Sequence, residues 1–178
     1  PRLDVELRVA HRMARQTVLF GDNPTPYLGI IHDDGLYYID KVEGDASVRL
    51  NIAVGVRRYL HSSCIGKLFL AYMNEDEQKR LIEKTGMPKV AKNTITEWSR
   101  FRDELQKIRE QGYAITDEES VDGVIGIAAP IRNHKDEIVA GICISAAVTR
   151  VMHRKDELIR MVLDVSKEIG EQLGNHRS

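Results

Sequence analysis

The chain has 178 residues, of which 42% are hydrophobic and 30% charged, so it is large and apolar enough to bury a core. Its 26 basic and 27 acidic side chains nearly cancel, which argues against a domain that binds nucleic acid by itself. The two cysteines form no CxxC motif, no apolar run approaches about 18 residues, and the first residues lack the pattern of a secretion leader. We therefore expect a reduced, cytoplasmic protein that does not span a membrane.

In chain order, the first predicted element is a helix over residues 3–15, where leucine and alanine recur every three to four positions. Residues 17–20 are predicted as a short strand. The apolar runs YLGIIH and LYYIDKV then flank an Asp-Gly pair at 34–35, which is typical of a β-hairpin. A further strand is predicted at 46–51.

The helical period returns after this strand. An amphipathic helix is predicted over 65–72, with Ser62 or Ser63 as its N-cap. Asn74, with Glu77 three residues on, has the pattern of a variant capping box and begins the next helix. The remaining predictions are helices from Thr96 to Gly112 and from Asp156 to Leu173, with a strand over 113–116 between them.

The segments GVIGIAAPIR and EIVAGICIS form a second predicted hairpin. Since side chains alternate across a strand, each segment has one aliphatic face and one face of small residues. A four-residue loop places Arg132 opposite Glu137, and this register places Gly126 opposite Cys143. The two small faces then coincide and form one nearly bare face. That face carries Val124, Gly126, Ala128, Pro130, Val139, Gly141, Cys143 and Ser145.

Two interpretations of this bare face stay open. In the first, a helix lies close against it. In the second, the missing volume is a ligand pocket, and Cys143 and Ser145 are its polar groups. Helices together with antiparallel hairpins indicate an α+β fold.

Three segments resemble one known family in their order and spacing. They are LHSSCIGKLFLAYMNEDE, IREQGYAITDEESVDGVIGIAAPI and IVAGICISAAVTR, and the earlier YYIDKVEG also fits. Over nearly its whole length the chain resembles the C-terminal effector-binding domain of the IclR family of bacterial and archaeal transcriptional regulators. The resemblance implies a GAF-like fold, in which helices cover a curved antiparallel sheet and a small molecule binds on the concave side.

The resemblance also implies the residues of an effector site. They are Leu50, Arg58, Ser63, Cys64, Ile65, Thr116, Val124, Gly126, Cys143 and Ser145. Thr116 stands where many relatives carry Asp, and Cys143 stands where the family typically has Ser. With Arg58 nearby, these departures favour an anionic ligand. The stretch HSSC would begin a helix whose free N–H groups and dipole suit a carboxylate.

The family also implies partners and a domain organisation. Residues 1–15 are expected to be a linker helix from an N-terminal winged helix-turn-helix domain that the given chain lacks, and residues 16–178 the effector-binding domain. The expected partners are a small organic-acid effector, DNA through the missing domain, and further copies of the chain in a homodimer or homotetramer. No cofactor is expected. The alternative is a free-standing GAF-like sensor that acts on a partner other than DNA.

HSSC raises two chemical alternatives as well. Cys64 with His61 as its base would make a small thiol hydrolase, but no third orienting residue is evident. A zinc site of His61, Cys64 and Cys143 would suit the metal, but the spacing matches no zinc motif. We expect instead a protein that is not an enzyme and binds no metal, in which His61 fixes its loop and Glu119 makes a structural contact.

Overall fold

The computed structural model describes residues 25–41 and 52–175. The helix predicted over 3–15, the strands predicted at 17–20 and 46–51, and Leu50 lie outside the described residues. The linker at 1–15 and the boundary at residue 16 therefore stay predictions.

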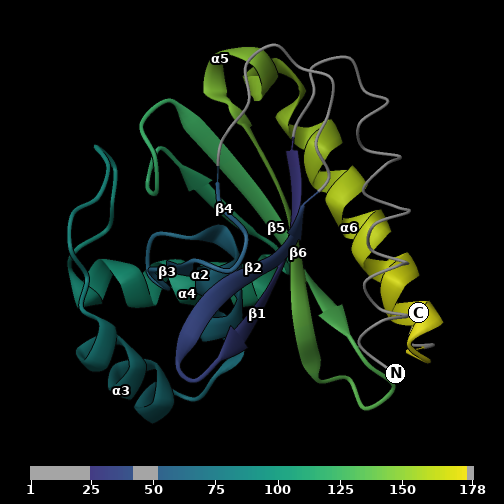
Figure 1. Cartoon of the computed structure of the whole chain (residues 1–178), viewed down its shortest axis with the longest axis horizontal. Coiled ribbons are helices and arrows are strands. Elements are labelled where there is room, and N and C mark those ends of the chain that lie inside the picture. The colour runs from purple at the N-terminus through teal and green to yellow at the C-terminus, as the bar shows by residue number, and fades with distance from the viewer. Residues whose placement is uncertain (1–24, 42–51, 176–178) are drawn as a thin grey trace.

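A single antiparallel sheet forms the centre of the fold (Figure 1). Its strand order is β3-β2-β1-β6-β5-β4, so the two predicted hairpins lie side by side through β1 and β6. The strands are β1 (Thr25–His32), β2 (Gly35–Lys41), β3 (Arg57–Arg58), β4 (Ala114–Asp117), β5 (Val124–Arg132) and β6 (Ile138–Ala147).

Helices cover both faces of the sheet. Helix α6 (Lys155–Gln172) lies along one face, and α2 (Cys64–Tyr72), α3 (Glu75–Thr85) and α4 (Trp98–Gln111) lie on the other side in Figure 1. The short helices α5 (Val148–Val151) and η1 (Met152–Arg154) connect β6 to α6. This arrangement confirms the α+β fold class. Within the described part of the chain, no helix combines the length and the apolar character that a membrane span requires.

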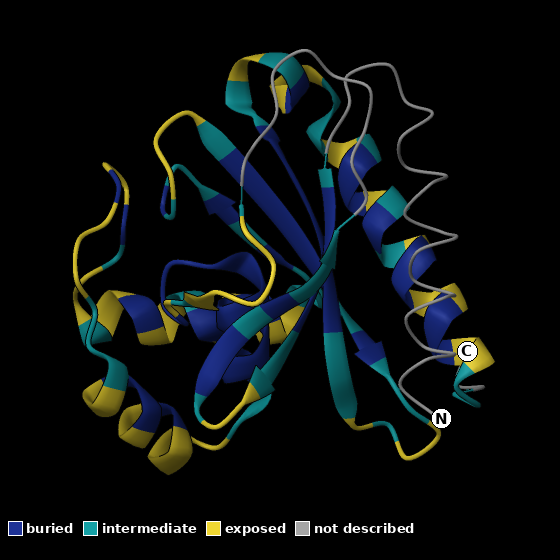
Figure 2. Ribbon diagram, in the orientation of Figure 1, coloured by how far each residue is buried: buried dark blue, intermediate teal, exposed yellow. Residues whose placement is uncertain are grey.

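The alternation of β5 and β6 creates two separate cores. Their aliphatic face, including Ile127 and Ile144, packs against Leu158 and Val162 of α6. Their small face, including Cys143, belongs to the other core, with α2 and α4. All of α2 except Tyr72 is buried, as Figure 2 shows, because α2 lies between the sheet and α4. The predicted assignment of faces is confirmed along most of the two strands, but it is wrong for Ile138, which packs in the core with α2, and for Val139, which packs in the core with α6.

The predicted register of the second hairpin is wrong by two residues. Gly126 pairs with Ser145, and Cys143 pairs with Ala128. The reason is the loop, in which the side chain of Asn133 accepts hydrogen bonds from the backbone of Lys135 and Glu137 and keeps Glu137 outside the ladder. A bulge at Ile131/Arg132 completes the slip. Since side chains alternate with period two, the slip of two residues leaves Gly126, Ala128, Cys143 and Ser145 on their predicted face. Beyond the bulge the slip is one residue, and there Ile138 and Val139 lie on the faces opposite to those predicted.

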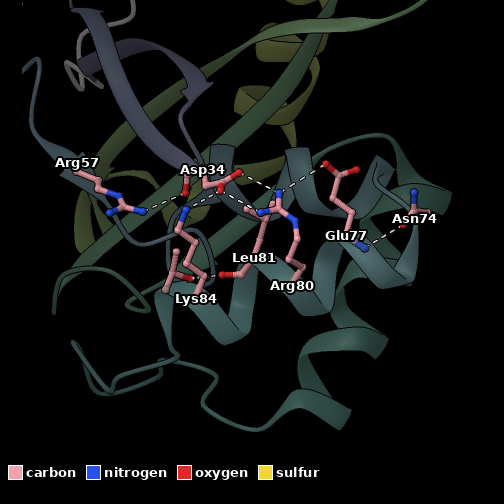
Figure 3. A network of polar contacts seen from close by, with 8 residues as sticks. Asp34, Arg57, Asn74, Glu77, Arg80, Leu81 and Lys84 are labelled. Atoms are coloured by element: carbon pink, nitrogen blue, oxygen red, sulfur yellow. Dashed lines mark hydrogen bonds and ion pairs between the residues drawn. The ribbon is translucent and has the colours of Figure 1, made fainter.

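The first hairpin turns at Asp33 and Asp34, which have φ values of 46° and 59°, rather than at the predicted Asp-Gly pair. Positive φ at both central residues is the pattern of a type I′ turn. The turn is held to α3, because Asp34 accepts two hydrogen bonds from Arg80 and one from Lys84, at 2.8–3.0 Å (Figure 3). These cations hold the pKa of the Asp34 carboxyl well below its usual range.

Helix boundaries follow local chemistry closely. Asn74 caps α3 as predicted, since its side chain accepts from the backbone N–H of Glu77 at 2.9 Å. Gly112 ends α4 in the left-handed conformation, with φ 83°. Helix α4 begins at Trp98 and not at Thr96. Ser63 is the N-cap residue of α2, as predicted, but its side chain makes no cap hydrogen bond.

Candidate ligand-binding site

The first turn of α2 packs directly on the bare face of the sheet. A Cβ atom added at Gly126 would lie 2.9 Å from Cys64 Sγ, and one added at Gly141 would lie 2.7 Å from Ile65 Cγ2. Both distances are shorter than van der Waals contact. The small residues of the sheet are therefore what allows Cys64 and Ile65 to enter it. This confirms the first interpretation of the bare face, that a helix lies against it.

Glycine at position 66 brings the preceding loop over this turn. A Cβ atom at Gly66 would overlap the backbone of Leu60, so only glycine fits there. The segment from Leu60 to Ser63 is completely or almost completely buried as a result. The HSSC stretch is thus a buried entry into α2.

A cluster of buried polar side chains surrounds the first turn of α2. Ser63 Oγ lies 3.0 Å from the hydroxyl of Tyr38 on β2. The Cys143 thiol has hydrogen-bonding contacts with the side chains of Tyr38, Ser145 and Cys64. Thr116 on β4 also has a hydrogen-bonding contact with Cys64. Three strands and the start of α2 therefore bring polar groups to one place in an otherwise apolar core.

The two thiols differ in their tendency to ionise. Hydrogen bonding with Cys143 lowers the pKa of Cys64, although burial opposes this effect. Hydrogen bonds with the N–H of Ile65 and with the Thr116 side chain, and the charge of Lys67, lower the pKa further. Burial raises the pKa of Cys143 well above its usual value. Negative charge is thus favoured at the N-terminus of α2, as expected where free N–H groups meet the positive end of a helix dipole.

Most of the predicted site residues meet at this turn. Ser63, Cys64, Ile65, Thr116, Gly126, Cys143 and Ser145 lie in or beside the cluster. Arg58 and Val124 are only partly buried. Arg58 donates to Ser120 Oγ at 3.2 Å, and its charge also acts on the phenols of Tyr27 and Tyr38.

Sequence reasoning missed Tyr27 and Tyr38. Their rings lie 5.1 Å apart between centroids, and Tyr27 pairs with Cys143 across β1 and β6. Burial raises the pKa of Tyr27 to about 12 and that of Tyr38 well above its usual value, so both phenols stay neutral hydrogen-bonding groups. The alternation of YLGIIH and LYYIDKV was the available signal, since it assigns each tyrosine to one face of the first hairpin.

Sequence reasoning also missed Lys67, which is the partner of the buried Glu119. The Lys67 ammonium is completely buried and lies 2.8 Å from a carboxylate oxygen of Glu119 and 3.0 Å from one of Glu104. It also donates to the backbone oxygen of Ile115 at 3.1 Å. The structural contact predicted for Glu119 is confirmed. Lys67 ties α2 to both α4 and the loop after β4.

His61 has the structural role predicted for it. It is fully buried, and its Nε2 hydrogen-bonds the backbone oxygen of Pro88 at 3.0 Å. Burial lowers the pKa of His61, so the ring is neutral, and Nε2 carries the proton that it donates. Among the described residues, no hydrogen bond joins His61 to Cys64, and no three His, Cys, Asp or Glu side chains gather as metal ligands.

A cavity of about 290 Å³ lies elsewhere, between the end of α2, the start of α3 and α4. Its lining includes Asn74, Gln78, Arg102 and Arg109, and none of the predicted site residues. The predicted site and this cavity are therefore separate places.

Comparison with known proteins identifies the family. Residues 7–171 match the family model described as "Bacterial transcriptional regulator IclR C-terminal". The HTH-type transcriptional regulator KdgR of Escherichia coli K12 is 29% identical over 174 residues, which cover 97% of this chain and 63% of KdgR. The crystal structure of the C-terminal domain of E. coli KdgR has a TM-score of 0.83 and covers 95% of this chain and 98% of that one.

Two more distant structures share the fold. One is a double mutant of the PobR inducer-binding domain from Acinetobacter in complex with 3-hydroxybenzoic acid, at 22% identity and a TM-score of 0.83, covering 91% of this chain and 95% of that one. The other is an IclR homologue from Microbacterium hydrocarbonoxydans in complex with 4-hydroxybenzoate, at 18% identity and a TM-score of 0.85. The match covers 95% of this chain and 68% of that one.

The chain spans 63% of the length of E. coli KdgR and 54% of the KdgR of Dickeya chrysanthemi. In both the family model and the KdgR structure, the matching part is the C-terminal domain. The expected GAF-like arrangement of a curved antiparallel sheet and its helices is confirmed by these neighbours. The chain therefore belongs to the IclR family of transcriptional regulators, as the effector-binding C-terminal domain.

Proposed function

We propose that this domain binds a small organic acid at the first turn of α2 and thereby changes how its regulator contacts DNA. The carboxylate would accept hydrogen bonds from the first N–H groups of α2, and Arg58 would supply the positive charge. The rest of the proposed site consists of Leu50, Ser63, Cys64, Ile65, Thr116, Val124, Gly126, Cys143 and Ser145.

The observation that carries this proposal is the uncapped N-terminus of α2. The first N–H groups of a helix have no partner within the helix and need an acceptor from elsewhere. At α3 the side chain of Asn74 supplies one. At α2 the N-cap is Ser63, but its hydroxyl pairs with Tyr38 and makes no cap bond. A carboxylate would fill this gap, and the helix dipole would favour its charge.

The surroundings suit the remainder of an organic acid. The neutral rings of Tyr27 and Tyr38 offer an apolar surface with two hydroxyls, and Thr116 and Ser145 offer short polar groups. Aromatic acids are the ligands named for the PobR domain and for the Microbacterium homologue, which share this fold. Both facts support an acid of this kind as the effector here.

A ligand at this place would move α2, because Cys64 and Ile65 now fill the bare face. Lys67, one turn further along α2, pairs with Glu104 of α4 and with Glu119. A shift of α2 would therefore also displace α4 and the loop after β4, which hold Glu104 and Glu119. Binding alters DNA contact only if the ligand prefers one arrangement of the subunits. We infer that this arrangement is a homodimer or homotetramer whose N-terminal winged helix-turn-helix domains contact DNA, in a cytoplasmic regulator that is not an enzyme.

Thermal unfolding with acids and their uncharged amides tests the proposal. The panel holds pyruvate, glyoxylate, sugar acids, protocatechuate and 4-hydroxybenzoate, each beside the corresponding amide. A ligand at about 100 times its Kd adds about 2.7 kcal/mol of stability. For a chain of this length that raises Tm by roughly 5–10 °C.

Variants locate the effect. We expect Arg58→Gln to reduce the shift given by the acid, and Arg100→Gln, which removes an exposed arginine of α4, to leave it unchanged. An amide that stabilises as well as its acid would contradict the proposed carboxylate site. So would an acid whose effect is the same in Arg58→Gln and the parent chain.

A further inference from the structure

The only two cysteines of the chain meet in the core. Cys64 is the first residue of α2, and Cys143 lies on β6. Both are free thiols, at 2% and 0% exposure, and their side chains have a hydrogen-bonding contact. The backbone supports this contact independently, because Cys64 Sγ lies over Gly126, and Ala128, two residues further along β5, pairs with Cys143. Residues 79 positions apart are thus placed as neighbours.

The pair is chemically unequal. The reactive form of cysteine is the thiolate. Cys64 has the lower pKa, since the hydrogen bond with Cys143 and, to a smaller extent, the N–H of Ile65 and the charge of Lys67 stabilise its anion. Cys143 has a raised pKa because it is buried. A thiol that ionises readily beside one that does not is the usual division between an attacking and a resolving cysteine.

We propose that Cys64 and Cys143 are an oxidisable pair that a peroxide converts to an intramolecular disulfide, which gives the effector site a second, redox input. This inference rests on the proposed function for access: a site that admits an organic acid also admits the smaller peroxide. The disulfide would fasten the first turn of α2 to β6. It would thereby oppose the movement of α2 that an effector requires.

The reaction balances with the peroxide as the sole oxidant. The Cys64 thiolate attacks one peroxide oxygen, the O–O bond breaks, and the other oxygen leaves as water after taking up a proton. This step leaves Cys64 as a sulfenic acid. The Cys143 sulfur then attacks the Cys64 sulfur, an S–S bond forms, and the S–O bond breaks to release a second water with the Cys143 proton. Two thiols are oxidised, and one peroxide is reduced to two waters.

Intact-mass analysis of the peroxide-treated chain tests the proposal. The reduced protein is treated with hydrogen peroxide, quenched in acid, unfolded and alkylated with N-ethylmaleimide. We expect a monomer that takes up no maleimide, has lost two hydrogen atoms, and regains both alkylation sites after a phosphine reductant. Because the chain has two cysteines, that mass identifies the bond without further mapping.

Two single variants test the roles of the thiols. Cys143→Ser removes the resolving thiol, and it should give a sulfenic acid that dimedone traps on Cys64. Cys64→Ser should keep its remaining thiol alkylatable, with oxidation slower by at least about tenfold because Cys143 is protonated. Equal oxidation rates in the two variants would overturn the assignment of Cys64 as the attacking thiol.

The proposal as a whole fails if the folded chain keeps both thiols alkylatable under conditions that oxidise the chain in denaturant. It also fails if the disulfide links two chains and not one. No organic acid is present in this assay. Its outcome is therefore separate from that of the ligand panel, and either proposal can fail alone.

Discussion

Replacement of Lys67 by methionine would remove the only cation from a buried ion pair between three segments. The Lys67 side chain is 0% exposed, and those of Glu119 and Glu104 are 11% and 22% exposed. Methionine retains most of the apolar length of lysine, so the change leaves packing nearly intact. What remains is two carboxylates that lie close together in a poorly solvated place.

Removal of one partner from a buried ion pair costs about 3–5 kcal/mol, because the other charge is left uncompensated. We expect Lys67→Met to reduce the free energy of unfolding by about this amount. For a chain of this length the corresponding fall in Tm is roughly 6–20 °C. The matched control is Lys79→Met on α3, whose lysine pairs with Glu75 on the solvent side. That variant should unfold at nearly the parent midpoint, since exposed pairs are screened by water.

The loss should depend on pH in a defined direction. Burial already raises the pKa of Glu119, and Lys67 opposes the rise. Without Lys67 the pKa of Glu119 in the folded protein rises further. A carboxyl whose pKa is higher in the folded than in the unfolded chain binds its proton more tightly when folded, so its cost falls as pH drops through the raised pKa. The difference in stability between Lys67→Met and the parent chain should therefore shrink between about pH 7 and about pH 5.

Urea unfolding at several pH values, followed by circular dichroism, measures these differences. The double variant Lys67→Met/Glu119→Gln should recover part of the lost stability, because one of the two uncompensated charges is gone. A loss below about 1 kcal/mol in Lys67→Met, the size expected of an exposed pair, would refute the reasoning. A loss that grows as the pH falls would refute it as well.

Three further substitutions test the packing and capping of the helices, each by the free energy of unfolding in urea. Gly141→Ala should destabilise by about 1–3 kcal/mol, because its Cβ would lie 2.7 Å from Ile65, and the added change Ile65→Ala should make Gly141→Ala cost less. Tyr38→Phe should cost about 1 kcal/mol by removing the partner of the buried Ser63 hydroxyl, and an unchanged stability would show that this bond adds nothing. Asn74→Ala should cost about 1 kcal/mol through the lost cap of α3, whereas Asn74→Asp should cost little.

The sequence predicted the faces of the sheet better than the pairing of its strands. Period-two alternation assigned Gly126 and Cys143 to the small face, and a slip of two residues could not change that assignment. The slip itself depends on hydrogen bonds that Asn133 makes inside its loop. Nothing in the spacing of apolar residues reports such bonds.

Predictions from local residue preferences also failed where the tertiary structure supplies a side chain with another hydrogen-bond or ion-pair partner. Asn74 lies at the surface and caps its helix, as its residue type predicts. Ser63 has the same local preference, but its hydroxyl forms a hydrogen bond with Tyr38 on β2 instead of capping α2. Lys67 lies on a helix that is buried all round, and only the fold reveals that Glu104 and Glu119 reach it. The candidate site was predicted from the family resemblance together with the bare face of the sheet. Neither of these predicted Tyr27, Tyr38 or the buried Lys67.

Backbone amide shifts in the ¹⁵N-labelled domain, titrated with the acid that raises Tm most, test the central claim most directly. The account predicts that the largest changes fall on the amides of Cys64, Ile65 and Gly66, which form the first turn of α2 against the bare face of the sheet. Large changes at Asn74, Gln78 and Arg109 around the separate cavity, with the first turn of α2 unaffected, would contradict it.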